Sequence, residues 1–295
     1  MSKILVTGAS GHLGQAVLRH LLETYKVPAG NIVAATRDTN KLSAVADKGV
    51  EVRKADFDDA STLDAAFAGI DTALIISTDA LAVPGQRLKQ HQAAVAAAVK
   101  AGVKHIAYTS MQNPGKSLVT FAPDHLGTEE AIKASGIPYT ILRNAWYNDN
   151  YLLSMPANLK RGQWYTAMGN GRVPNVSRDD CARAVAAALA NAKGDSKIYN
   201  ITGSKSCTAD EIATIVSTAA GKPLSVIKVS PSDLQKGIES AGLPSFVAEM
   251  VATADANIAA GNFDEVTNDY ETLTGEKPQT TEAFMQAHKA ALLSA

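Results

Sequence analysis

The chain contains 295 residues, and its 28 lysines and arginines almost balance its 29 aspartates and glutamates, so its formal net charge is −1. A hydrophobic fraction of 46% and a charged fraction of 19% are typical of a globular protein and exclude an intrinsically disordered one. The charge balance argues against a nucleic-acid partner, and two cysteines are too few for a disulfide framework. The sequence shows neither a leader pattern nor a long apolar run, which argues against a membrane partner. We therefore expect a cytoplasmic protein with one large or two unequal α/β domains.

The first half of the chain alternates between two hydrophobic periodicities. Short apolar runs bounded by turn residues predict six buried strands, at residues 3–7, 31–36, 50–54, 72–77, 104–109 and 138–142. Helical spacing lies between them, at residues 12–23, 39–46, 60–67, 86–101 and 124–134. Because neighbouring parallel strands need a long right-handed return, this alternation predicts a doubly wound parallel sheet.

The alternation becomes irregular after about Asn144. Residues 163–166 and 197–201 are strand-like, and capping patterns predict helices that begin near Ser177 and Thr208. A third helix is expected over residues 244–259. We therefore predict a doubly wound domain over residues 1–144 and a smaller α/β lobe over residues 145–295, although the chain can cross back into the first domain. The lobe would cover the carboxyl ends of the strands, where open α/β sheets bind ligands.

Three glycines lie between the first predicted strand and the first predicted helix. Gly8, Gly11 and Gly14 permit a tight turn, the approach of a pyrophosphate to the backbone, and close packing of the helix on the strand. The N–H groups at the start of the helix would then hold the phosphates. The spacing predicts a dinucleotide site; the alternative is a glycine-rich turn without a ligand, in which His12 faces solvent.

The tip of the second strand discriminates between NAD and NADP. An acidic side chain there would accept from the ribose 2′-hydroxyl, whereas an arginine would bind the 2′-phosphate of NADP. The chain has Arg37 at this point and Lys41 one turn later, which favours NADP. In the alternative, Asp38 turns towards the ribose and Arg37 is merely solvated.

Polar residues also follow the third and fourth predicted strands. Asp56 and Phe57 come just after the third strand and could bracket the adenine, or they could be a helix-capping aspartate and a core phenylalanine. Ser77 and Thr78 end the fourth strand, where the ribose on the nicotinamide side would lie.

The proton donor of ordinary short-chain carbonyl reductases is missing. These enzymes use a Tyr-x-x-x-Lys pair, and none of the eight tyrosines here is followed by a lysine four positions later. Tyr139 with Arg143 comes nearest, but the segment reads as a buried strand. The absence argues against a sugar-nucleotide epimerase as well, and neither a metal-binding histidine pattern nor a Gly-x-Ser-x-Gly elbow is present.

Three segments together resemble a known family: residues 6–14, 101–110 and 136–147. They are similar to the NmrA-like, atypical short-chain dehydrogenase/reductase family, in particular to its bacterial NADPH-dependent quinone oxidoreductases (type 2) and triphenylmethane reductases. The likeness extends over most of the chain. It implies a Rossmann domain with a small C-terminal lobe, an oxidoreductase activity, and NADPH as the electron donor.

The resemblance also implies roles for individual residues. It places the phosphates on Gly8, Ala9, Ser10, Gly11, His12 and Leu13. It assigns Arg37 to the 2′-phosphate, Ser77 and Thr78 to the ribose side, and Arg178 to a further cofactor contact. Along the nicotinamide it places Ile141, Leu142, Arg143, Asn144, Ala145 and Trp146.

One position departs from the related isoflavone reductases. Those relatives keep a catalytic lysine before the Gly-Ile-Pro-Tyr-Thr strand, and alignment on that strand places His125 at the lysine position. The departure puts a lysine-assisted reaction in doubt. His125 could donate a proton instead, because the unperturbed pKa of histidine lies close to neutrality, or it could only shape the pocket.

The few aromatic residues, 5% of the chain, cluster at Trp146, Tyr147 and Tyr151, directly after the sixth strand. Flat rings suit a flat acceptor, although these could also fill the junction between the lobes. Asn144 is the polar side chain best placed to orient either the nicotinamide amide or the quinone oxygen, and Tyr147 is a further candidate catalytic residue. We therefore expect hydride transfer from NADPH to a small quinone-like molecule, with a non-catalytic, NmrA-like redox sensor as the alternative. The alanine-rich helix over residues 93–101 could pack on a twin helix in a homodimer, or simply on the sheet.

Overall fold

The computed structural model describes residues 2–192 and 194–294. They form two compact units, each assembled from three segments of the chain. Unit 1 comprises Met1–Met111, Asp124–Arg143 and Cys181–Tyr199, and unit 2 comprises Gln112–Pro123, Asn144–Asp180 and Asn200–Ala295. The chain therefore passes between the units near Asn144, and also returns to unit 1 with residues 181–199. The role of residues 145–295 as a covering lobe stays a prediction.

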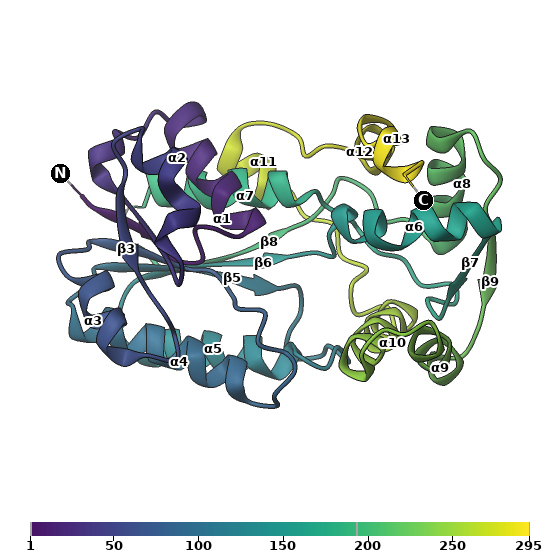
Figure 1. Ribbon diagram of the computed structural model, residues 1–295, viewed down its shortest axis with the longest axis horizontal. Coiled ribbons are helices and arrows are strands. Elements are labelled where there is room, and N and C mark those ends of the chain that lie inside the picture. Colours follow the sequence, from purple (N-terminus) through teal and green to yellow (C-terminus); the bar gives the residue numbers. More distant parts are fainter. Residues whose placement is uncertain (1, 193, 295) are drawn as a thin grey trace. The chain divides into compact units, whose positions relative to one another are not determined.

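A seven-stranded sheet forms the centre of unit 1 (Figure 1). Its spatial order is β3-β2-β1-β4-β5-β6-β8. The strands are β1 (Ile4–Val6), β2 (Ile32–Thr36), β3 (Glu51–Lys54), β4 (Thr72–Ile75), β5 (His105–Met111), β6 (Tyr139–Asn144) and β8 (Lys197–Ile201). The pairings from β3 through β5 are parallel, with Leu5 opposite Val33 and Ala73. The predicted doubly wound parallel sheet is thus confirmed, and its order reverses between β1 and β4.

Helices cover both faces of this sheet (Figure 1). On one face lie α3 (Ala60–Phe67), α4 (Gln86–Lys100) and α5 (Ala122–Ala134); on the other lie α1 (His12–Arg19), α2 (Ser43–Ala46) and α7 (Arg178–Ala190). Two predicted helices are shorter than expected. The first is α-helical only to Arg19 and continues as a π-helical turn, and the second opens with a 3-10 turn before α2.

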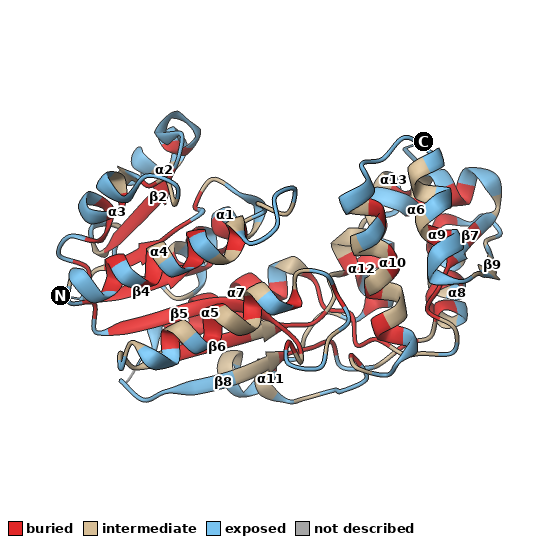
Figure 2. Ribbon diagram, turned by 90° about the horizontal axis from the view of Figure 1, so that it is seen from below, coloured by how far each residue is buried: buried red, intermediate tan, exposed pale blue. Residues whose placement is uncertain are grey.

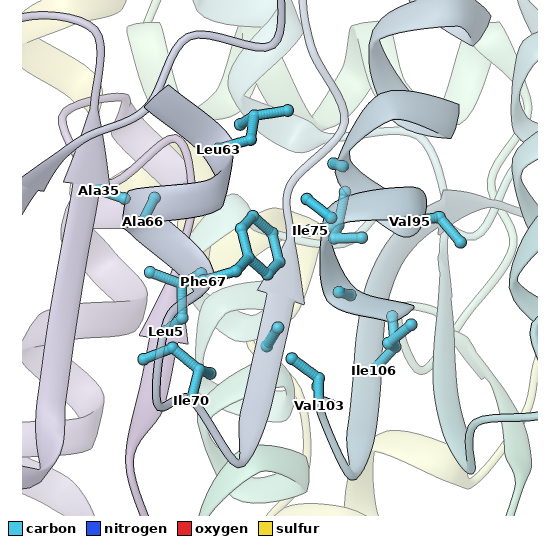
Figure 3. Close-up of a cluster of buried hydrophobic side chains, with 14 of the residues drawn as sticks. Leu5, Ala35, Leu63, Ala66, Phe67, Ile70, Ile75, Val95, Val103 and Ile106 are labelled. Atoms are coloured by element: carbon cyan, nitrogen blue, oxygen red, sulfur yellow. The ribbon is translucent and has the colours of Figure 1, made fainter. Parts of the chain in front are cut away.

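The core of unit 1 explains why its central strands are mainly apolar, whereas β3, which was predicted to be buried, is an edge strand with exposed or half-buried residues. Every residue of β1, β2, β4 and β5 is buried because helices cover both faces (Figure 2). The ring of Phe67, from the end of α3, lies among Leu5 of β1, Ile75 of β4 and the neighbouring Ile70 (Figure 3). The same cluster includes Ala94 and Val95 of α4, so this packing holds both α3 and α4 against the sheet.

Unit 2 has a smaller sheet than unit 1 and is mainly helical. Its two parallel strands are β7 (Gln163–Thr166) and β9 (Ser225–Lys228). Its helices are α6 (Tyr151–Arg161), α8 (Ala209–Ala220), α9 (Pro231–Ser240), α10 (Ser245–Ala259), α11 (Asp269–Thr274), α12 (Thr281–Ala287) and α13 (Lys289–Leu292). The predicted capping box is present, since Thr208 and Glu211 bond each other's backbone N–H groups at the start of α8. No helix in the described residues is both long and apolar enough to cross a membrane.

Candidate functional site

The glycine loop between β1 and α1 has a shape that only glycine allows at two positions. Gly8 has a φ of +59°, which favours a residue without a side chain. A Cβ at Gly14 would lie 2.3 Å from the carbonyl oxygen of Gly8, which is closer than atoms can approach. The N–H of Gly11 donates to that same carbonyl at 3.0 Å. The three predicted glycines therefore form one tight turn that brings the start of α1 against the end of β1.

The start of α1 is open to an anion. Its N-cap residue is Gly11, and no side chain among the described residues caps the first turn. The first N–H groups of a helix lack intrahelical partners and carry a partial positive charge, so they favour a phosphate. Gly11 itself is exposed, which leaves the backbone approachable.

Hydrogen bonds hold this loop on the neighbouring strand ends. The Thr7 hydroxyl donates to the carbonyl of Leu74 at 2.9 Å and accepts from the N–H of Ile76 at 3.1 Å. The hydroxyls of Ser10 and Thr36 share a hydrogen bond of 2.6 Å. These hydrogen bonds join the loop to the end of β4 and to the end of β2, and they hold the loop in this conformation.

Arg37 and Asp38 follow β2 and have different surroundings. The carboxylate of Asp38 accepts from the N–H of Asn40 at 3.1 Å and caps the short turn Thr39–Leu42. Arg37 is exposed and has no hydrogen bond or ion pair with any residue the structure describes. The geometry therefore favours Arg37 over Asp38 as the group that meets a ligand at this strand tip.

The residues after β3 and β4 are both half-buried. Asp56 accepts from the N–H of Asp58 at 3.1 Å within a local turn, and Phe57 packs against the core of unit 1. The residue that caps α3 is Asp59, not Asp56. The N–H of Ser77 donates to the Thr109 hydroxyl, and the N–H of Thr78 donates to Nε2 of His91, both at 2.9 Å. Contacts of these four residues with a cofactor stay a prediction.

His125 lies in α5 and is buried. Its Nδ1 is 2.9 Å from the Tyr108 hydroxyl, and its Nε2 is 2.9 Å from the Arg87 guanidinium. Burial, together with the charge of Arg87, holds the pKa of His125 well below its usual value, so the ring stays neutral. These contacts favour the hypothesis that His125 shapes its surroundings over the hypothesis that it donates a proton.

Several residues predicted to contact the nicotinamide lie in or next to β6, and their side chains are buried or hydrogen-bonded within the protein. Ile141, Leu142 and Ala145 are buried. The Arg143 guanidinium makes two hydrogen bonds to Glu129, at 2.9 and 2.6 Å, and the Ser110 hydroxyl donates to the same carboxylate. Burial alone would raise the pKa of Glu129, but the bonds from Arg143 and Ser110 hold it below its ordinary value. The Arg143 side chain therefore supports the sheet.

A polar group of unit 2 begins at Asn144, the last residue of β6. The Asn144 amide donates to the Tyr147 hydroxyl at 2.9 Å, while its own Oδ1 is buried and accepts from none of the described residues. The Arg178 guanidinium lies 5.3 Å from the centre of the Tyr147 ring and forms an ion pair of 3.3 Å with Asp149. The structure thus brings together Asn144, Tyr147 and Arg178, three residues that the sequence suggested separately.

The other two aromatic residues of the predicted cluster lie elsewhere in unit 2. Trp146 is half-buried and packs on Phe263, with ring centres 6.1 Å apart. Tyr151 is buried at the start of α6, where its hydroxyl donates to Asn175 and its ring meets the edge of Trp164. Tyr151 is therefore a core residue, and the expectation that it faces an acceptor is wrong.

Sequence reasoning missed a set of buried polar residues around the turns after β3 and β4. Arg87, Gln90 and His91 of α4 are buried, as is Tyr108 of β5. Their signal in the sequence is a group of polar residues, Gln86, Arg87, Gln90 and His91, at helical spacing just before an alanine-rich run. Polar groups buried in this way need partners, and those partners cannot be identified from spacing.

Comparisons with known proteins find similarity over almost the whole chain. The model of the NmrA-like family matches residues 1–285. Quinone oxidoreductase 2 of Escherichia coli (strain K12) is 37% identical over 285 residues, which are 97% of this chain and 98% of the relative. Both units of this chain fall within that match.

Two solved structures are similar over almost their full length. An NADPH-dependent quinone oxidoreductase of Escherichia coli, complexed with NADPH, has a TM-score of 0.91 and 36% identity, covering 97% of this chain and 99% of that one. Triphenylmethane reductase of Citrobacter sp., complexed with NADP(H), has the same TM-score and identity, covering 97% and 100%. Both relatives are reductases, one crystallised with NADPH and the other with NADP(H).

Proposed function

The chain belongs to the NmrA-like family, and from this premise we propose that it oxidises NADPH by transferring a hydride to a flat, quinone-like small molecule. The sequence-based predictions of this family, of NADPH as cofactor and of an oxidoreductase are confirmed by the full-length similarity to quinone oxidoreductase and triphenylmethane reductase. The observation that carries the proposal is the glycine turn with its open helix start, together with an Arg37 whose side chain pairs with none of the residues that the structure describes.

The residues present fit NADPH. The backbone from Gly8 to Leu13 would hold the pyrophosphate, Arg37 the 2′-phosphate, and Ser77 with Thr78 the ribose on the nicotinamide side. When bound, NADPH would supply the hydride, and the chain itself would supply binding and orientation. Arg178 remains a proposed further contact of the cofactor.

The missing Tyr-x-x-x-Lys pair is compatible with a quinone acceptor. Hydride addition to a quinone gives an aromatic hydroquinone anion, which can take its proton from water or from a weak acid. The protein then has mainly to hold the acceptor ring flat against the nicotinamide, and positioning supplies most of the rate.

We assign that positioning to Asn144 and Tyr147. The Asn144 amide donates to the Tyr147 oxygen and so fixes the place of this phenol. We propose that the Tyr147 hydroxyl donates a hydrogen bond to the quinone oxygen on which negative charge develops as the quinone accepts the hydride. The nearby Arg178 guanidinium favours negative charge that develops beside Tyr147.

The direct test follows NADPH oxidation by the purified protein with a benzoquinone, a naphthoquinone and a triphenylmethane dye, with NADH in parallel. We expect turnover with NADPH and much slower turnover with NADH. A protein that binds oxidised cofactor but turns over no acceptor would contradict the proposal and favour a redox sensor. A homodimeric state and a cytoplasmic location stay predictions.

A further inference from the structure

The amino-terminal half of α4 carries four polar side chains on one side of the helix. Gln86 and Gln90 form one row and Arg87 and His91 the next, because residues four apart lie above one another on a helix. Arg87, Gln90 and His91 are only 5%, 6% and 0% exposed. Burying such groups is unfavourable unless they are hydrogen-bonded, so their partners show what this half of the helix holds.

The glutamine row reaches the turn that follows β3. Nε2 of Gln90 donates to the carboxylate of Asp58 at 2.7 Å, and Gln86 donates more weakly to the same group at 3.4 Å. The N–H of Asp58 in turn donates to the Asp56 side chain. The row thus holds the turn from Asp56 to Asp58, which is the turn predicted to contact the adenine.

The Arg87–His91 row reaches the turn that follows β4. Nε of Arg87 donates to the carbonyl of Thr78 at 2.7 Å, and the N–H of Thr78 donates to Nε2 of His91 at 2.9 Å. Both backbone polar groups of Thr78 are therefore held by α4. Thr78 is one of the two residues predicted to lie on the ribose next to the nicotinamide.

A second layer of hydrogen bonds fixes the protonation state of His91. Because Nε2 of His91 accepts from Thr78, its Nδ1 carries the hydrogen and donates to the Thr128 hydroxyl at 2.9 Å. The Thr128 hydroxyl donates onward to the carbonyl of Asp124 at 2.6 Å. A neutral ring of one tautomer thus holds the Thr78 turn.

These contacts connect two turns that the sheet does not connect directly. In the sheet, β2 and β1 lie between β3 and β4, so no strand pairing sets the spacing of the two turns that follow β3 and β4. The helix α4 contacts both. All of these residues belong to unit 1.

We infer that Gln86, Arg87, Gln90 and His91 are positioning residues for the dinucleotide: the glutamine row sets the adenine turn, and the Arg87–His91 row sets the ribose turn. The inference rests on the proposed NADPH site. A turn that is already held in its binding conformation loses less freedom on binding, so the two rows raise the affinity for the two halves of NADPH separately. A purely structural role would change stability without this separation.

The test compares two ligands by titration calorimetry: NADPH and adenosine 2′,5′-bisphosphate, which lacks the nicotinamide half. Gln90→Met removes the bond to Asp58 at similar volume, and should weaken both ligands roughly five-fold. His91→Leu removes the acceptor for Thr78, and should weaken NADPH roughly ten-fold while leaving the bisphosphate unchanged. His91→Gln keeps an acceptor near the position of Nε2 and should restore most of the NADPH affinity.

Two results would overturn the inference: equal weakening of both ligands by His91→Leu, or a His91→Gln variant as weak as His91→Leu. If His91→Leu does not fold, Thr128→Val takes its place, because it removes the second partner of His91 at nearly constant volume. It should weaken NADPH by a smaller factor and spare the bisphosphate, and unchanged NADPH affinity would count against the inference.

Hydrogen–deuterium exchange separates this inference from the proposed function. Without ligand, exchange in Gln90→Met should accelerate at residues 56–58, and in His91→Leu at residues 76–78. Exchange that is unchanged, or faster throughout unit 1, would contradict the positioning role. If the wild-type protein binds neither ligand while the two variants show these local changes, only the proposed NADPH site is contradicted.

Discussion

The glycine turn of unit 1 and the group of Asn144, Tyr147 and Arg178 in unit 2 (the Asn144 group) differ in whether backbone or side chains form them. The turn is mostly backbone: a left-handed Gly8, a Gly14 without room for a Cβ, and an uncapped start of α1. The Asn144 group is made of side chains, in which Tyr147 contacts both Asn144 and Arg178. A site made of backbone tolerates few residue types at its critical positions, whereas a site made of side chains can be retuned by single replacements.

The difference matches the two ligands of the proposed reaction. The dinucleotide is constant, and it would be held by features that the fold imposes. The acceptor can be any of several flat molecules, and it would be held by an amide, a phenol and a guanidinium. We therefore expect replacements in the turn to abolish binding, and replacements in the Asn144 group to change rates more moderately.

Gly14→Ala should have the largest effect. The new Cβ would lie 2.3 Å from the Gly8 oxygen, so the turn and α1 must move apart. We expect the free energy of unfolding to fall by roughly 3 kcal/mol, and NADPH binding to be lost in calorimetric titration. Gly30→Ala is the matched control, because nothing lies within 4 Å of a Cβ at Gly30. Equal behaviour of the two variants would mean that the backbone of the turn does not define the site.

Acidification should have the next largest effect, because it destabilises unit 1 through His91. Burial, with a contribution from Arg87, lowers the pKa of His91 to about 3, whereas the unfolded chain regains the ordinary value of 6.5. The unfolded state therefore binds more protons between these values, and stability falls as pH falls through this window, by up to about 1.4 kcal/mol per pH unit. Chemical denaturation measured across that range checks the slope. His91→Gln should flatten it and the exposed His12→Gln should not; identical slopes for both would exclude His91 as the cause.

Arg37→Glu tests the side chain that is proposed to hold the 2′-phosphate of the dinucleotide. Loss of a charged hydrogen bond to the 2′-phosphate should raise the Michaelis constant for NADPH roughly 30-fold and spare that for NADH. Steady-state kinetics with both cofactors measure the split. Lys41→Glu, one turn further along, serves as the control and should have a smaller effect. An equal loss with NADPH and NADH would remove Arg37 from the phosphate site.

The parts of the molecule that the sequence predicted well are those set by local geometry. Glycines at fixed spacing, an arginine at a strand tip and runs of buried β-residues each depend on neighbours in the chain. The turn, the exposed position of Arg37 after β2 and the parallel sheet could therefore be derived from them, whereas the role of Arg37 at the 2′-phosphate stays a prediction. The helix α6 was missed because Pro156 lies inside it, and proline normally ends a helical pattern.

The parts that could not be predicted depend on residues distant in sequence. The buried contacts of His125 join it to Tyr108 and Arg87, which are 17 and 38 positions away. Arg143 has a predicted place at the nicotinamide, but its guanidinium binds the buried Glu129. A polar residue near a site can serve the ligand or the fold, and only its partners in space decide between the two.

Tyr147→Phe should have the smallest effect, and it addresses the side-chain half of the comparison. If the Tyr147 hydroxyl donates to the acceptor oxygen, its loss should lower kcat about ten-fold, less than for a typical general acid, because a hydroquinone anion is a stable product that water can protonate. The NADPH affinity should not change. Tyr165→Phe removes an exposed hydroxyl that bonds only Gln163 in this unit and should leave kcat unaltered. Stopped-flow measurement of a single turnover separates the chemical step from product release. A drop in NADPH affinity, or a decrease in kcat shared by the two variants, would show that Tyr147 supports the fold rather than the acceptor, and the Asn144 group would then be as structural as Arg143.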